Sequence, residues 1–196
     1  TPYYAILKDA VPDEHGSYDC TNLETKLRTY YLKWLKSTID KDFSGKTAVD
    51  LKYLIKNQVD LINIINGFRM KTFFNADANT IESNMLPFYG RLSKKKQHEI
   101  FDATDADDYL KRLQRTYYGR QMETFAEPLE KSLLENHAHA LRYKYSKLTL
   151  RASQSAPVSL YTILFLFDIE IENITNIVEG IRYKAPITYI EKLLIL

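Results

Sequence analysis

The sequence of 196 residues contains little of what several classes of protein depend on. Cys20 is the only cysteine, which excludes an internal disulfide framework and a cysteine-based zinc site and suits a reducing compartment. Glycine and proline number six each, which favours long regular elements over a loop-rich scaffold. The formal net charge is only +2, so no sequence-wide basic field indicates a nucleic-acid partner.

Long hydrophobic runs are also missing. The longest apolar stretch, VSLYTILFLF at residues 158–167, is about half of the ~18 to 20 residues that cross a bilayer. The opening TPYYAILKDAVPDEHG has neither the basic start nor the apolar centre of a signal peptide. If the protein works at a membrane, we therefore expect another subunit to hold it there.

The chain is instead rich in aromatic residues and helical periodicity. Fifteen tyrosines and nine phenylalanines suit long elements that pack through amphipathic aromatic surfaces. Apolar spacing predicts helices over 22–39 and 48–73. The second has an apolar stripe on one side (Leu51, Leu54, Ile55, Leu61, Ile62, Ile65, Phe68) and polar residues opposite (Lys52, Lys56, Asp60, Asn63). Further helices are predicted at 94–101, capped by Ser93, within 102–118, and over 121–148 with Pro128 as its start or a kink. The fold class is all-α.

Two segments of the sequence repeat in the same order. NIINGFRMK at 63–71 matches NIVEGIRYK at 176–184, and LRTYYLKW from Leu27 matches LRYKYSKL from Leu141, at offsets of 113 (176 − 63) and 114 (141 − 27). Residues 158–171 alone favour a strand, because they are rich in β-branched and aromatic residues. The repeat decides for a helix over 158–184, since its apolar positions match those of 51–68.

The repeat predicts a duplicated helical hairpin. We expect residues 22–73 and 136–186 to superpose by a rotation, which makes a ring or funnel a natural shape. We interpret 1–21 as an irregular lead-in, 22–100 as a first helical module and 101–196 as a second, all in one continuous structural unit.

Several short motifs resemble chemical sites without meeting their requirements. SGKT at 44–47 lacks the leading glycine and the strand of a phosphate-binding loop, so we expect the chain neither to bind nor to hydrolyse ATP. His137 and His139 point apart on a helix and cannot share a metal, and the run of lysines at 94–96 is interpreted as a solvated face. The acidic residues Asp102, Asp105, Asp107 and Asp108 suit a helix N-terminus better than a metal site. We predict no catalytic residue, no metal and no cofactor.

Motifs along the whole chain resemble one family. The segments TPY, VDLINIINGFRMK, MLPFYGRLS, QRTYYG and EIENITNIVEGIRYKAPITYIEKLLI are similar to the C subunit of bacterial and archaeal V/A-type ATPases and to the d subunit of the vacuolar ATPase. The family commonly has a glycine-rich turn where this chain has LPFYGRLS.

The resemblance implies a funnel of three helical modules around a pseudo-threefold axis. This chain shows two of them, so it is interpreted as a C-terminal two-thirds fragment or a truncated relative. The implied function is non-catalytic coupling on the cytoplasmic face of the membrane. In this role the protein is a socket that joins the central shaft to the proteolipid ring and passes torque between ATP-driven rotation and ion transport.

The repeated helices supply the candidate contact residues of such a socket. We expect Asp60, Asn63, Arg69, Asn176 and Arg182 to lie near one rim and to contact a partner, because equivalent positions in rotated copies approach a common axis. The alternative interpretation makes them ties within the chain, in particular Arg69 and Arg182 at the edges of buried faces.

Two other functions remain open from the sequence. One is a helical adaptor or scaffold outside any ATPase, and the other is a helical metal-dependent enzyme with dispersed acidic residues. A third repeat encoded upstream or neighbouring ATPase genes would favour the coupling role, and bound metal in the purified protein would favour the enzyme.

Overall fold

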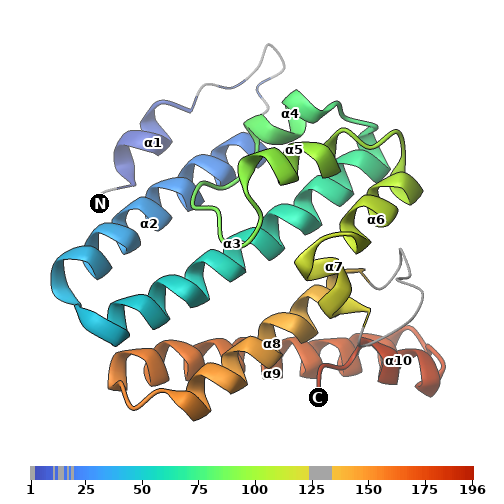
Figure 1. Cartoon of the computed structure of the whole chain (residues 1–196). Coiled ribbons are helices and arrows are strands. Elements are labelled where there is room, and N and C mark those ends of the chain that lie inside the picture. Colours follow the sequence, from blue (N-terminus) through green and yellow to red (C-terminus); the bar gives the residue numbers. More distant parts are fainter. Residues whose placement is uncertain (1–2, 11, 13–15, 17, 19, 124–133) are drawn as a thin grey trace.

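The computed structural model describes residues 3–10, 12, 16, 18, 20–123 and 134–196 (Figure 1). All regular elements in these ranges are helices, which confirms the predicted all-α class. They are α1 (Tyr4–Lys8), α2 (Cys20–Asp42), α3 (Gly45–Phe74), α4 (Ala78–Ser83), α5 (Lys94–Phe101), α6 (Ala106–Gln114), α7 (Tyr117–Met122), α8 (Leu134–Ala152), α9 (Ala156–Arg182) and α10 (Ile187–Leu193).

Two hairpins of long helices form the body of the molecule. α2 and α3 run side by side in one hairpin, α8 and α9 in the other, and α3 also packs against α8 (Figure 1). The short helices α4 to α7 lie between the hairpins in the chain and pack on one another. α4, α5 and α6 also pack on α3, and α7 packs on α8. The helix predicted over 158–184 is confirmed by α9, and the rotation that relates the two hairpins stays a prediction.

The helix predicted within 102–118 is in fact two helices. Asp105 starts α6 and accepts a hydrogen bond from the backbone N–H of Asp108, as expected for acids at a helix N-terminus. Thr116 then adopts an extended backbone, its hydroxyl donates to Leu113 O and accepts from Gly119 N, and α7 begins behind it. This local side-chain capping interrupts the helix that apolar periodicity alone predicts.

Other boundaries differ by less. The predicted cap Ser93 is confirmed, because its side chain accepts from Lys96 N. α2 begins at Cys20, two residues before the predicted start. The short helix α1 lies in the lead-in predicted to be irregular, and α4 lies between two predicted helices. The helix predicted over 121–148 is found as the end of α7 and as α8, while Pro128 lies outside the described residues.

The core consists of two clusters, one at each half of α3. The larger cluster joins the second half of α3 to α4 through α8, and the second joins α2 and the first half of α3 to the start of α9 at Val158. Six of the seven residues predicted to form the apolar stripe of α3 are buried, and Ile62 is half-buried. The positions of α9 matched by the repeat are exposed, from 37% at Ile177 to 68% at Ile181. The apolar face of α3 is therefore buried, while the matching face of α9 is exposed to solvent.

Asp40 joins α2 to α3 and gives the fold a pH-dependent contact. Lys36 Nζ donates to Asp40 Oδ2 at 2.6 Å, and Lys52 of α3 pairs with the other carboxylate oxygen. Hydrogen bonds from Lys36 and then Lys52 lower the pKa of Asp40 from 3.8 to about 2. Because the folded pKa lies below the unfolded one, this stabilisation is present above the unfolded pKa and is lost as the pH falls towards about 2.

We expect Asp40→Asn to melt below the native chain at neutral pH and to lose that difference in acid. Melting temperatures of both proteins between about pH 5 and about pH 2 measure this convergence. Parallel melting curves across that range would show that Asp40 does not link folding to pH.

Candidate functional site

Asp60 is the centre of a buried polar cluster. It lies on α3 with none of its surface exposed, and both carboxylate oxygens face hydrogen-bond donors. Oδ1 accepts from Gly90 N at 3.0 Å and from Gln97 Nε2 at 3.3 Å, and Oδ2 accepts from Arg91 N at 2.8 Å and from Leu92 N at 3.1 Å. The cluster therefore fixes the loop before α5 onto α3.

Tyr118 of α7 completes this cluster. Its hydroxyl lies 2.9 Å from Asp60 Oδ2 and 2.7 Å from Asn57 Oδ1, so one hydrogen is shared between two acceptors. Burial raises the pKa of Asp60, and the donors at Gly90, Leu92 and Tyr118 act in the opposite direction. Since these groups donate to both oxygens, the ionised carboxylate fits the cluster best.

Gly90 is required for the close approach of the loop. A Cβ at this position would lie 2.6 Å from Asp60 Oδ2 and 2.9 Å from the carbonyl oxygen of Lys56. Both distances are shorter than van der Waals contact. The sequence LPFYGRLS, which departs from the glycine-rich turn of the family resemblance, thus keeps its glycine where the backbone meets α3.

Asn63 fixes the start of the same loop. Its Nδ2 donates to Leu86 O at 3.0 Å and its Oδ1 accepts from Leu86 N at 2.9 Å, with 1% of the residue exposed. Asp60 and Asn63, one turn apart on α3, therefore act together on residues 86–92. Neither side chain presents surface to a partner in this structure.

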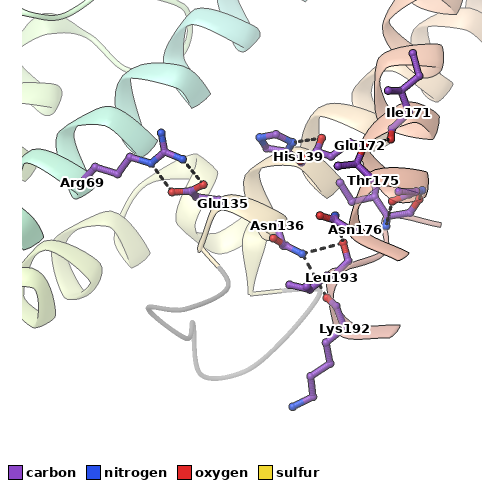
Figure 2. Close-up of polar contacts among 12 residues, drawn as sticks. Arg69, Glu135, Asn136, His139, Ile171, Glu172, Thr175, Asn176, Lys192 and Leu193 are labelled. Carbon is purple, nitrogen blue, oxygen red and sulfur yellow. Dashed lines mark hydrogen bonds and ion pairs between the residues drawn. The ribbon is translucent and has the colours of Figure 1, made fainter. Parts of the chain in front are cut away.

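Arg69 connects α3 to α8 (Figure 2). Its Nε and Nη2 donate to Glu135 Oε1 and Oε2, each at 2.5 Å, in a bidentate pair. The hydrogen bond from Arg69 to Glu135 raises the pKa of Arg69. The two side chains stay 52% and 42% exposed, so this pair is accessible from solvent.

Asn176 connects α9 to the end of α10. Its Nδ2 donates to Leu193 O at 3.4 Å, and Asn136 of α8 donates to the same oxygen at 3.0 Å (Figure 2). Glu135 and Asn136, at the start of α8, thus link Arg69 on one side to Asn176 on the other. Arg182 ends α9, is exposed, and lies over the ring of Tyr183 at 5.7 Å.

The predicted contact residues fall into separate groups. Asp60 and Asn63 share the 86–92 loop, and Arg69 pairs with the first turn of α8. Asn176 shares the carbonyl of Leu193 with Asn136 of that turn, and Arg182 stands apart at the end of α9. The sequence did not reveal Glu135, the partner of Arg69, or Asn136, which donates to the same carbonyl as Asn176. Spacing of three or four residues reveals polar pairs only within one helix, and here the partners are on different helices.

The other motifs noted in the sequence make contacts within the chain. Asp108 accepts from Arg112 Nε at 2.9 Å and from Thr104 N at 3.0 Å, and His139 Nδ1 lies 2.8 Å from Glu172 Oε2 (Figure 2). SGKT forms the turn into α3, with Ser44 at its N-cap. Among the residues that the structure describes, no group of three or more His, Cys, Asp or Glu side chains is placed to hold a metal.

The helices also differ from membrane spans. Over residues 3–10, 20–123 and 134–196, none of them combines the length and the apolar character that crossing a membrane requires.

These features define an all-α protein built on two long helical hairpins and cross-linked by buried and exposed polar contacts. A family model described as ATP synthase (C/AC39) subunit matches residues 1–193. The chain therefore belongs to this family, which is the V/A-type ATPase C/d family that its motifs resemble. Searches of the curated proteins and of the solved structures gave no match.

Proposed function

We propose that this chain is a non-catalytic coupling component of a V/A-type rotary ATPase. In this role it is a socket between the central shaft and the proteolipid ring, attached to the cytoplasmic face of the membrane through the complex. The observation that carries the proposal is the family match, which extends over residues 1–193. ATP is hydrolysed or made elsewhere in such a complex, and this protein passes on torque.

The length of α3 and its fixed contacts support the proposal. α3 has 30 residues and is about 45 Å long. It is fixed to the loop 86–92 by Asp60 and Asn63 and to α8 by Arg69. A protein that transmits torque needs helices that do not slide past one another, and the buried polar contacts of Asp60 and Asn63 oppose such sliding.

The contact role of the predicted residues is part of the proposal. Arg69 and Arg182 are exposed and carry charge, so they are the members of the set that a partner can reach. Asn176 contributes by holding the end of α10. Asp60 and Asn63 contribute by fixing the loop 86–92 rather than through their own surface.

A charge exchange separates contact with a partner from contact within the chain. Arg69→Glu removes the pair with Glu135, and the double variant Arg69→Glu with Glu135→Arg restores it in the opposite orientation. We expect the single variant to lose about 1 kcal/mol of stability and the double variant to recover it, because the pair is exposed. Assembly with the shaft and ring subunits should stay at least about tenfold weaker in both, and in Arg182→Glu.

Arg28 and Glu24 provide the matched control, since they form an exposed Arg–Glu pair at 2.7 Å on α2. The same exchange there should leave assembly unchanged. Melting curves measure stability, and pull-down with the shaft and ring subunits measures assembly. Full recovery of assembly by the Arg69 and Glu135 exchange would mean that Arg69 acts only through its ion pair within the chain. Failure of the native chain to assemble with the shaft and ring subunits would contradict the proposed function.

A further inference from the structure

α9 carries an exposed row of apolar side chains with coiled-coil spacing. The members lie four and three residues apart in alternation and are each 57% to 68% exposed: Leu160, Leu164, Phe167, Ile171, Ile174, Val178 and Ile181. We call this row the α9 seam. A regular alternation of four and three is the 3.5-residue repeat by which one helix packs along another.

The opposite side of the same helix is already used. Val158, Thr162, Phe165 and Ile169 are buried against the rest of the molecule. α9 is thus apolar on both sides, a pattern ordinarily found in helices that are covered all round. Single exposed apolar residues are common, whereas a continuous apolar surface of this length marks an interface.

Charge along α9 limits what can cover the seam. The helix contains four acids, Asp168, Glu170, Glu172 and Glu179, and its only basic residue is Arg182 at the C-terminal end. Glu172 is bonded to His139, while Asp168 and Glu170 are exposed on the two flanks of the seam at its centre, beside Phe167 and Ile171. Two antiparallel copies joined seam to seam would bring Asp168 and Glu170 of each copy together at the centre of the seam, far from Arg182 at its end.

A lipid surface is also a poor match for this charge. Helices that lie on membranes carry Lys and Arg on their polar face, which anionic head groups attract. Asp168 and Glu170, which flank the centre of the α9 seam, have the opposite sign. A protein helix with basic flanks satisfies both the spacing and the charge.

We propose that the α9 seam binds an amphipathic α-helix of a partner protein. This helix carries about three heptads of apolar side chains, flanked by lysine or arginine, and lies along α9 at the shallow crossing angle of coiled coils. The seam runs from Leu160 to Ile181, which corresponds to about 32 Å of helix. This surface is defined by α9 alone and does not depend on the proposed ATPase function.

A synthetic helix tests this surface directly. The probe is a labelled peptide of about three heptads with Leu and Ile at the core positions and Lys at the flanks, titrated with the full chain by fluorescence anisotropy. We expect saturable binding in the micromolar range, at least about tenfold weaker for the same peptide with Glu at the flanks. Phe167→Glu should weaken binding of the Lys peptide by a similar factor.

Phe73→Glu is the matched control, because Phe73 is also an exposed phenylalanine on a long helix, at 75% exposure against 61% for Phe167. It should leave binding unchanged, and melting curves confirm that both variants fold. Equal binding of the Lys and Glu peptides, or no saturable binding, would overturn the proposal. A dimer in sedimentation that Phe167→Glu dissociates would also overturn it, because the seam would then bind a second copy of the chain. Tight binding to anionic vesicles would overturn it as well, because the seam would then bind lipid.

Discussion

Asp60→Ala is expected to lower the free energy of unfolding by about 4 kcal/mol. The substitution removes the acceptor of three consecutive backbone amides, of Gln97 and of Tyr118, all inside the protein. Buried donors without an acceptor are costly, and the loop 86–92 would lose its attachment to α3. Urea denaturation of native and variant chains measures the difference.

Asp77→Ala is the control for this prediction. Asp77 also accepts from a backbone amide, Thr80 N at 2.7 Å, but it does so on the surface as the N-cap of α4. Its replacement should cost only about 1 kcal/mol. Similar losses for the two variants would mean that the buried cluster does not hold the fold together.

Gly119→Ala is expected to cost about 3 kcal/mol, because a Cβ at this position has no space. It would lie 2.1 Å from Leu113 O and 2.6 Å from Gln114 Cα, which are backbone atoms of α6. Backbone cannot move aside as a flexible side chain does, so α6 and α7 would have to separate. The same urea experiment, supported by the heat of unfolding, reports the loss.

Gly180→Ala separates this effect from a general effect of adding a methyl group in a helix. Its Cβ would meet the Cδ1 and Cγ1 atoms of Ile190 at 2.6 Å, which belong to a side chain that can change conformation. The gain in helix propensity, about 1 kcal/mol, offsets part of that cost. We expect a net change within about 1 kcal/mol, and equal losses at Gly119 and Gly180 would refute the backbone argument.

The long helices were predictable because their apolar spacing is strong. α3 and α9 were both predicted within a few residues of their ends, the second against the strand preference of residues 158–171. The internal repeat supplied this information, since matched apolar positions carry a helical period that short-range preference lacks. The break at Thr116 was missed because it depends on one hydroxyl rather than on a period.

The environment of each helix face was harder to predict. Asp60 and Asn63 lie opposite the apolar stripe of α3, which on a surface helix would leave them in water. The loop 86–92 covers that side and supplies their partners, a long-range path of the chain that periodicity does not encode. For α9 the reverse holds, because the same apolar pattern that is buried in α3 lies exposed.

The partners of the candidate contact residues were also hard to predict, because they lie on other helices. Arg69 could be placed at the edge of a buried face from the sequence, but Glu135 lies 66 residues away in the chain and on another helix. Asn176 likewise depends on the carbonyl of Leu193, which α10 brings back along α9. Contacts between helices need the fold, whereas caps such as Ser93 need only a few neighbouring residues.

Coupling can be measured directly in the rotary ATPase. The experiment compares a V/A-type ATPase complex depleted of this protein with the same complex after the chain is added back, in vesicles, following ATP hydrolysis and ion uptake together. We expect the depleted complex to hydrolyse ATP without transporting ions and the added chain to restore ion uptake. Equal ion uptake with and without the chain, while the chain fails to join the complex, would contradict the coupling role.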